Sequence, residues 1–386
     1  MSVWDDLVGQ ESAVVTLRRA VAARESSDRH AMSHAWLITG PPGSGRSNAA
    51  RAFAAALECP AGGCGTCSAC RTALSGAHPD VTLVRTEQLS IGVDEVRDLA
   101  RRAAMGPTLG PRQVLVVEDA DRVTERGADA LLKSIEEPSP KTVWVLCAPT
   151  PDDVVVTIRS RCRQLHLVTP SDEAVARLLE QRDGIDPALA AHAARAAQGH
   201  VGRARALARD ETARNRRHEI LKIPGQLVSV GACLTAAANI VKASADEAAQ
   251  ATADIDARER AELSEALGMG TKGARPRNVQ TALKELDDQQ KARAKRLQRD
   301  ALDRVLTELT TFLRDVLVLQ TVPGPARRLV NPELGEAITA AARSSSPETT
   351  IRRIDALLAA RTALEGNVAP LLAIEAMLLA MADTAA

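Results

Sequence analysis

Residues Gly40–Ser47 constrain the fold of this chain more than any other segment. They read Gly-Pro-Pro-Gly-Ser-Gly-Arg-Ser, and they lie between the apolar run Ala35–Thr39 and the helix-favouring run Asn48–Ala54. In a glycine-rich loop between a strand and a helix, backbone N–H groups and the helix N-terminus can surround a phosphate group. The pattern G-x-x-x-x-G-K-[ST] is a phosphate-binding loop, so the sequence predicts such a loop here.

One position of this loop departs from the pattern, because Arg46 stands where the pattern has lysine. A guanidinium is planar and forked, whereas an ammonium is compact, so the exchange is not conservative in a tight cradle. The candidate nucleotide contacts are Gly40, Gly43, Ser44, Gly45, Arg46 and Ser47. Two interpretations stay open: the loop binds ATP or ADP with Mg²⁺ on Ser47, or it is only a scaffold.

A second acidic motif follows the apolar run Val114–Val117, as Glu118 and then Asp119. In phosphate-loop ATPases the strand's terminal Asp helps to hold Mg²⁺, and a following Glu often polarises the attacking water. Here the order is reversed, so each side chain has the wrong length for its task. Since errors near 1 Å can cost about a hundredfold in rate, this motif and Arg46 both point to a degraded site.

The first 168 residues alternate apolar runs with helical patterns, which predicts an α/β domain with a parallel sheet. The expected strands are Ala35–Thr39, Val81–Arg85, Val114–Val117, Val143–Cys147 and Gln164–Val168. The expected helices are 11–24, 46–57, 92–104 and 126–137.

The rest of the chain reads as helical. We expect a small helical domain at 169–212 and an all-α domain at 213–386. Within the latter, 268–278 reads as a loop. The stretch of about 240–300 matches no pattern that we can name and is interpreted as an insertion. Its basic run Lys291–Arg299 is typical of a solvated helix face.

Four cysteines, Cys59, Cys64, Cys67 and Cys70, lie within twelve residues that are rich in glycine. Four thiolates at this spacing favour a structural, tetrahedral Zn²⁺ site with no position left for catalysis. Disulfides, an iron–sulfur cluster and free thiols are the alternatives. We expect a cytoplasmic protein with reduced thiols, because the sequence shows no signal-peptide pattern and no membrane span.

Charge excludes a simple nucleic-acid-binding protein. Lys plus Arg and Asp plus Glu both number 49, so the chain has no overall positive field that would attract DNA. Any contact with DNA is therefore local or made through a partner.

Several segments together resemble the clamp-loader branch of the AAA+ ATPases. They are Trp4–Gln10, the cysteine cluster behind the phosphate-loop helix, Ala130–Pro138 (Ala-Leu-Leu-Lys-Ser-Ile-Glu-Glu-Pro) and Ser160–Cys162 (Ser-Arg-Cys). The resemblance covers residues 1–168 strongly. It is weaker at Gly199–Arg203, and the first cysteine departs from the family's usual spacing.

This resemblance implies an AAA+ phosphate-loop core, a helical lid and a helical collar for oligomerisation. It implies that Arg161 is an arginine finger that completes a neighbour's ATP site, and that Trp4–Gln10 lies near the adenine pocket. It places Thr150 near the sensor-1 position and Arg203 at the sensor-2 element. The implied partners are the motor subunits of tau/gamma type and a delta subunit in a hetero-pentamer. Through that complex, the sliding clamp and primer-template DNA are also implied partners.

We therefore expect a clamp-loader subunit of the bacterial replicative DNA polymerase, with little or no ATPase activity of its own. An active ATPase motor subunit of the same machine and an unrelated AAA+ regulator are the alternatives. Nothing in the chain resembles a polymerase active site, so any nucleotidyltransferase activity belongs to the complex.

Overall fold

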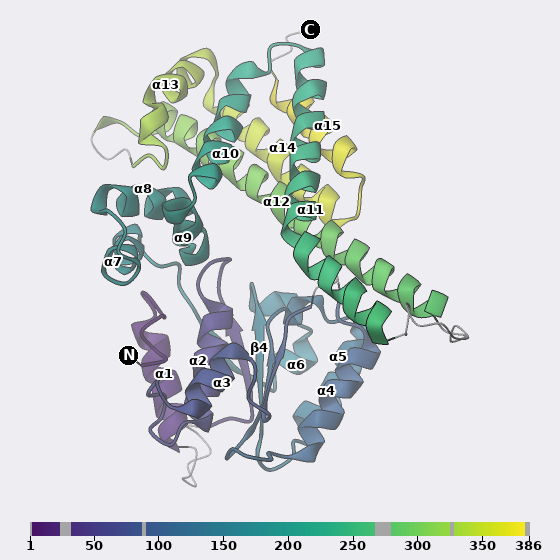
Figure 1. The fold of residues 1–386 in the computed structure, drawn as a ribbon. Helices are drawn as coiled ribbons and strands as arrows, with labels where there is room; N and C mark the ends of the chain where they lie inside the picture. Colours follow the sequence, from purple (N-terminus) through teal and green to yellow (C-terminus); the bar gives the residue numbers. More distant parts are fainter. Residues whose placement is uncertain (1, 24–31, 87–89, 267–278, 325–327, 383–386) are drawn as a thin grey trace. The chain divides into compact units, whose positions relative to one another are not determined.

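The computed structural model describes residues 2–23, 32–86, 90–266, 279–324 and 328–382 (Figure 1). The chain divides into two compact units, Met1–Arg209 and Asp210–Ala386. In the described ranges, no helix is long and apolar enough to cross a lipid bilayer.

A sheet of five parallel strands organises the N-terminal unit. The strands are β1 (Ala35–Thr39), β2 (Val81–Val84), β3 (Gln113–Val117), β4 (Thr142–Ala148) and β5 (Arg163–His166). Their order is β2-β3-β4-β1-β5, so β1 lies between β4 and β5. Leu37 of β1, for example, pairs with Leu146 of β4 and Gln164 of β5. The central strands β1, β3 and β4 are mostly apolar and are buried along their whole length, which requires cover on both faces.

Helices supply this cover on both faces of the sheet (Figure 1). They are α1 (Glu11–Ala22), α2 (Arg46–Glu58), α3 (Ser68–Ser75), α4 (Val93–Met105), α5 (Glu125–Glu136) and α6 (Val156–Arg159). On one face, Phe53 of α2 packs edge-on against Trp36 of β1, with ring centroids 5.2 Å apart. On the other face, Leu99 of α4 and Leu131 of α5 share a core with Leu37.

Three further helices complete this unit and pack against one another. They are α7 (Asp172–Asp183), α8 (Pro187–Ala197) and α9 (Val201–Arg209). Ser171 caps the start of α7, and Gly184 ends it in a left-handed conformation. Arg205 and Arg209 of α9 both bind Asp183, at 2.8 Å and 2.9 Å. The separate domain at 169–212 remains a prediction, since these helices lie in one compact unit with the sheet.

The C-terminal unit is built from helices in every part that the structure describes. They are α10 (Glu211–Lys222), α11 (Val230–Ala266), α12 (Val279–Thr321), α13 (Gly335–Ser344), α14 (Pro347–Glu365) and α15 (Pro370–Met381). Leu306 and Phe312 of α12 form an apolar core with Leu357 of α14 and Ile374 of α15. This core buries the apolar residues that recur every three or four positions along α12.

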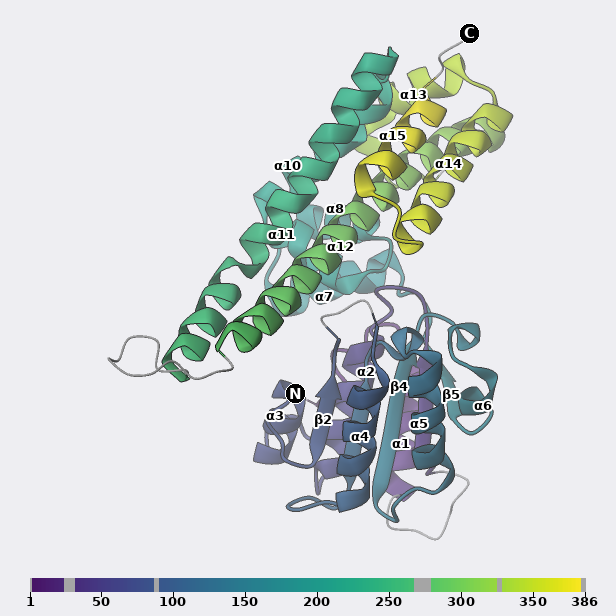
Figure 2. The same cartoon turned by 90° about the vertical axis from the view of Figure 1, so that its right-hand side faces the viewer.

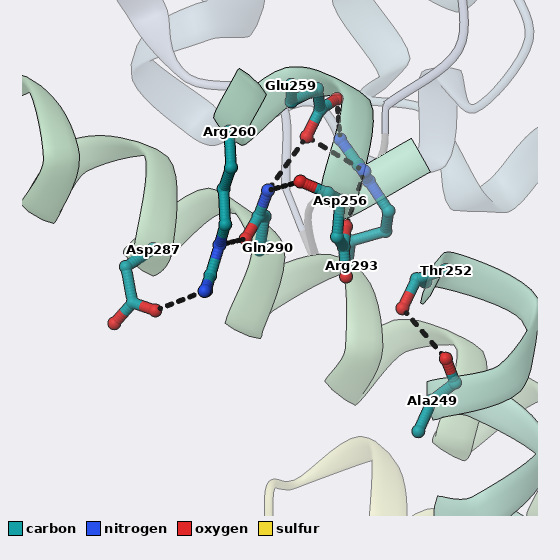
Figure 3. A network of polar contacts seen from close by, with 8 residues as sticks. All are labelled: Ala249, Thr252, Asp256, Glu259, Arg260, Asp287, Gln290 and Arg293. Atoms are coloured by element: carbon teal, nitrogen blue, oxygen red, sulfur yellow. Dashed lines mark hydrogen bonds and ion pairs between the residues drawn. The ribbon is translucent and has the colours of Figure 1, made fainter. Parts of the chain in front are cut away.

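The helices α11 and α12 lie side by side and extend well beyond this bundle (Figure 2). Their distal contact is polar (Figure 3). Arg293 binds Asp256 at 2.9 Å and Glu259 at 2.7 Å, while buried Gln290 accepts a hydrogen bond from Arg260 at 2.8 Å. The stretch 240–300 thus includes most of a helical hairpin. Arg293 is only 11% exposed, so this residue of the basic run departs from the expected solvated face.

The observed elements follow the predicted ones closely in the N-terminal unit. The predicted strand Ala35–Thr39 is confirmed in full, and the other four strands shift by one or two residues at their ends. The helix that was expected to stop before Pro138 ends at Glu136. Residue 24 of the first predicted helix and the loop 268–278 lie outside the described residues. The short helices α3 and α6 were not predicted.

Candidate functional site

The phosphate loop has the strand–loop–helix geometry that the sequence predicts. Strand β1 ends at Thr39, and α2 begins at Arg46. Gly43 and Gly45 have φ angles of 85° and 91°, which lie in the region that favours glycine. Because Gly45 is also the N-cap of α2, the loop leads directly into the positive end of the helix.

Arg46 turns back onto the loop itself. Its Nη1 donates a hydrogen bond to the carbonyl oxygen of Gly40, the first residue of the loop. Burial lowers the pKa of Arg46, although nearby Asp121 and Asp119 oppose this effect. An arginine stays protonated in proteins, so the charge persists but is directed at a backbone carbonyl.

His200 contacts the same loop from the start of α9. A Cβ built on Gly43 would lie 2.4 Å from the His200 ring and 2.5 Å from its Cα, so the two residues are in direct contact. The Nδ1 atom of His200 accepts the backbone N–H of Arg203 at 3.2 Å. Burial first, and then the charges of Arg203 and Arg46, lower the pKa of His200. A neutral imidazole therefore covers the loop at Gly43.

The predicted magnesium carboxylates lie just beyond the end of β3. Glu118 is nearly buried, and its Oε1 binds Nε of Arg51 on α2 at 2.6 Å. Asp119 precedes a short turn of 3₁₀ helix at Ala120–Arg122. Glu118 is thus engaged by a cation of the chain itself, next to the phosphate loop.

Thr150, Ser47 and Ser44 are three further predicted nucleotide contacts. Thr150 is exposed, and both its N–H and its hydroxyl donate to Asp153, at 2.8 Å and 2.9 Å. Ser47 lies in the first turn of α2. The hydroxyl of Ser44 is buried and has no hydrogen-bond partner within the described residues, so it could still serve a bound anion.

Gln10 joins the phosphate loop to the segment after β5. Its Nε2 donates to the carbonyl of Ser44 at 3.2 Å and to that of Val168 at 2.7 Å, and its Oε1 accepts the Val168 N–H at 3.1 Å. At the other end of the predicted adenine segment, Trp4 donates to Gly62 in the cysteine region. The segment therefore bridges the loop and the cysteines.

The four predicted cysteines come together in space, each offering its sulfur within 4.8 Å of the others. The sulfur of Cys59 lies 3.7 Å from those of Cys64 and Cys67. A tetrahedral site with Zn–S bonds of about 2.3 Å has sulfurs roughly 3.8 Å apart, so this geometry suits zinc. Cys59, whose sequence spacing departs from the family, therefore belongs to the set.

Backbone N–H groups point at several of these sulfurs, as they do around bound thiolates. The N–H of Gly65 donates to the sulfur of Cys70 at 3.4 Å, and the N–H of Cys70 donates to the sulfur of Cys67 at 3.4 Å. Cys67 is also the N-cap residue of α3. Hydrogen bonds from the Thr66 and Cys67 backbone lower the pKa of Cys64 to about 6. Such donors favour the thiolate form that a metal ion needs, whereas burial raises the pKa of the Cys70 thiol.

Arg161 lies at the surface after α6, with 41% of its side chain exposed. Its Nη2 binds Glu136 at 2.5 Å, and its Nη1 donates to the Thr157 carbonyl at 2.8 Å. The guanidinium is therefore positioned by α5 and α6 yet remains accessible.

The sequence did not single out three residues that matter at this site. Arg51 carries no pattern of its own, and its link to Glu118 joins positions 67 apart. His200 belongs to a predicted motif, but its contact with Gly43 depends on how α9 packs. Glu58, which precedes Cys59, groups with His78 and Asp80 as a second set of possible metal ligands.

Comparison with known proteins finds similarity in the N-terminal region. Residues 17–171 match the family described as DNA polymerase III, delta subunit. The chain is 41% identical to DNA polymerase III subunit delta' of Pseudomonas aeruginosa over 138 residues, which are 34% of this chain and 42% of that protein. It is 35% identical to DNA polymerase III subunit delta' of Escherichia coli over 164 residues, which are 41% of this chain and 48% of that protein.

Other relatives carry the names of different subunits. DNA polymerase III subunit tau of Bacillus subtilis is 30% identical over 176 residues, which cover 45% of this chain and 30% of that protein. A gamma subunit-related protein of Thermotoga maritima superimposes with a TM-score of 0.40 at 15% identity, over 95% and 99% of the two chains.

The matched region spans less than half the length of each of these sequence relatives. The two delta' relatives match at higher identity than the tau subunit does. Residues 17–171 thus match the family described as DNA polymerase III, delta subunit, and this part of the chain is similar to relatives named DNA polymerase III subunit delta'.

Proposed function

We propose that this chain is a delta-prime-type clamp-loader subunit that does not turn over ATP itself. In this proposal, Arg161 completes the ATP site of an adjacent motor subunit of tau/gamma type. The complex, which also holds a delta subunit, opens the sliding clamp and closes it on primed DNA. The relatives named delta', tau and gamma/tau support the assignment to such a complex.

The contact between Arg46 and Gly40 carries the proposal that the chain's own site is degraded. A working phosphate loop presents its cation to the β- and γ-phosphates, whereas this cation binds the loop's own carbonyl. The ion pair of Glu118 with Arg51 and the contact of His200 with Gly43 support the same conclusion. These residues do not fit a catalytic Mg²⁺–ATP complex, and we assign no hydrolytic step to them.

Passive nucleotide binding is the second candidate for this loop. The glycine geometry is intact, and the buried Ser44 hydroxyl remains available to an anion. The helix N-terminus favours an anion at this place even without a lysine. ATP or ADP would then be held without being consumed.

The setting of Arg161 supports its role as a finger. Its ion pair with Glu136 is exposed on both sides, and such pairs contribute little to stability, so the guanidinium can be released at small cost. An arginine fork is suited to the spread charge of a transferring phosphoryl group. A finger supplied to a neighbour can raise the rate by about 10³–10⁵.

We propose further that the four cysteines bind one structural Zn²⁺. The sulfur spacing and the N–H donors support this assignment. The cysteines would hold the ion and fix the turn at Gly62 and Gly63, to which the N-terminal segment is bonded. Such an ion requires reduced thiols, which agrees with a cytoplasmic protein.

The test of the degraded site is nucleotide binding and turnover by the isolated chain. Binding of a fluorescent ATP analogue is measured by anisotropy, and phosphate release is measured in the same sample with Mg²⁺ present. We expect weak or passive binding and no release of phosphate above buffer. Steady phosphate release by the lone chain would overturn the proposal and favour the active motor subunit.

A further inference from the structure

Three buried side chains of metal-binding type meet next to the cysteine region. Glu58 is the last residue of α2, and His78 and Asp80 precede β2. Their exposed fractions are 4%, 5% and 0%. Each offers a ligand atom within 4.8 Å of the other two. A carboxylate removed from water in this way needs charge compensation.

Asp80 receives part of this compensation from one turn of backbone. Its Oδ1 accepts the N–H of Thr108 at 2.6 Å, and its Oδ2 accepts those of Leu109 and Gly110 at 2.7 Å and 2.5 Å. Burial opposes the charged form, but these three donors outweigh it and lower the pKa of Asp80. Asp80 is therefore a carboxylate.

His78 is joined to Asp80 through one of its ring nitrogens. Its Nδ1 accepts the backbone N–H of Asp80 at 3.2 Å. A ring nitrogen that accepts an N–H has its lone pair engaged and is not open to a metal ion. The other nitrogen, Nε2, is then the atom that can bind a metal ion.

Glu58 adds a second carboxylate at the same turn. A Cβ built on Gly110 would lie 1.7 Å from its Oε2 and 3.4 Å from Oδ2 of Asp80. The two carboxylates thus flank the same glycine in a region closed to solvent. A cation bound between two carboxylates this close would offset their mutual repulsion.

We propose that Glu58, His78 and Asp80 form a second metal site, which binds a divalent transition-metal ion. One imidazole nitrogen with carboxylate oxygens is a donor set that suits Zn²⁺ or Mn²⁺, and it lacks the soft thiolates of the cysteine cluster. The site would fasten the end of α2 to the turn at 108–110. It is distinct from the cysteine site in ligands and in expected spectrum.

Metal titration of the full chain tests this site. The protein is stripped with a chelator and titrated with Co²⁺, which gives an intense thiolate band only when sulfur is bound. We expect two ions per chain, of which one develops the thiolate band and one does not. Glu58→Gln should lose the second ion and keep the thiolate band, whereas Cys67→Ser should lose that band and keep the second ion.

Asp94→Asn serves as the matched control, because Asp94 is 91% exposed, and it should bind two ions. His78→Gln is measured beside Glu58→Gln, so that the result does not depend on the folding of one variant. A wild-type chain that binds a single ion with the thiolate band would overturn the proposal. So would a Glu58→Gln chain that binds as many ions as the wild type.

Discussion

Arg46 brings a full positive charge into the phosphate loop, yet its Nη1 donates to the Gly40 carbonyl. A lysine at this position would release that carbonyl, but two other obstacles would remain. His200 would still contact Gly43, and Glu118 would still be bound to Arg51. At the scale of residues, three separate contacts therefore oppose catalysis, and one substitution cannot remove them all.

We predict that Arg46→Lys tightens nucleotide binding by about tenfold or less, which is about 1.4 kcal/mol. It should produce no turnover. Anisotropy of a fluorescent ATP analogue measures the first effect, and phosphate release measures the second. Turnover by the Arg46→Lys chain would show that Glu118 and Asp119 can still organise Mg²⁺, against this interpretation.

Glu118 should contribute to stability through its pair with Arg51. Glu118→Gln weakens a charge-assisted hydrogen bond to a nearly buried carboxylate, and we expect a loss of about 1–3 kcal/mol in the free energy of unfolding. Urea denaturation measures it. Asp94→Asn, which breaks an exposed pair with Arg97, should cost less than about 1 kcal/mol. Equal losses for the two variants would contradict the structural role of Glu118.

Residues that carry a pattern could be predicted from the sequence, whereas their partners could not. The loop glycines and the four cysteines follow fixed local spacings, so they were found without a structure. Arg51 contacts Glu118 and His200 contacts Gly43, and only the packing of α2 and α9 creates these contacts. An arginine on a helix and a histidine in a turn look the same in the sequence whether or not they meet a site.

At the scale of elements, the cysteine region holds both α3 and the N-terminal segment. Cys67 caps α3, and the Gly63 carbonyl accepts hydrogen bonds from Ser2 and Val3 at 3.0 Å and 3.1 Å. Removing the proposed zinc should free both, because binding energy at a structural site is also folding energy.

We therefore predict that a strong chelator lowers the melting temperature and increases hydrogen exchange in residues 2–4 and 59–75. Exchange in β3 and β4 should change much less, since these strands lie in the centre of the sheet. Adding zinc back should restore both readings. Exchange in residues 59–75 that does not respond to chelation or to zinc would count against a metal-dependent element.

The distal hairpin of α11 and α12 depends on polar contacts. Arg293→Ala would leave Asp256 and Glu259 without their shared cation, and we predict a loss of about 1–3 kcal/mol in local stability. Hydrogen exchange measured in 250–265 should rise, while that of α14 and α15 should not. Lys291→Ala is the control, because Lys291 is 66% exposed. An equal effect of the two variants would refute the role of Arg293 in holding α12 against α11.

The strands were predictable because a buried parallel strand is an uninterrupted apolar run, which short-range sequence shows directly. The helix α3 was missed because its eight residues are set by the cysteine turn that caps it. The hairpin was missed for a different reason. Its two helices meet through Gln290 and Arg293 of α12. In the sequence, polar residues at such a helix–helix contact look like solvent-exposed ones until their partners on α11 are known.

At the scale of the whole molecule, we propose that the chain combines a degraded phosphate-loop site with an accessible arginine, Arg161. Arg159 and Arg161 lie in the same short region of the N-terminal unit. Each forms an ion pair with a carboxylate, Arg159 with Asp152 and Arg161 with Glu136. Of the two, only Arg161 is the arginine of the Ser-Arg-Cys segment, whose resemblance implies the proposed finger. The pair therefore offers a test with a control that differs by two positions.

The most direct measurement is the ATPase rate of a loader reconstituted with its motor subunits, clamp and primed DNA. We predict that Arg161→Ala lowers turnover at the site that it serves by about 10³-fold or more. Gel filtration should show normal assembly, and Arg159→Ala should leave the rate near that of the wild type. A fully assembled Arg161→Ala loader with unchanged turnover would contradict the central claim, because the arginine would then take no part in the neighbour's site.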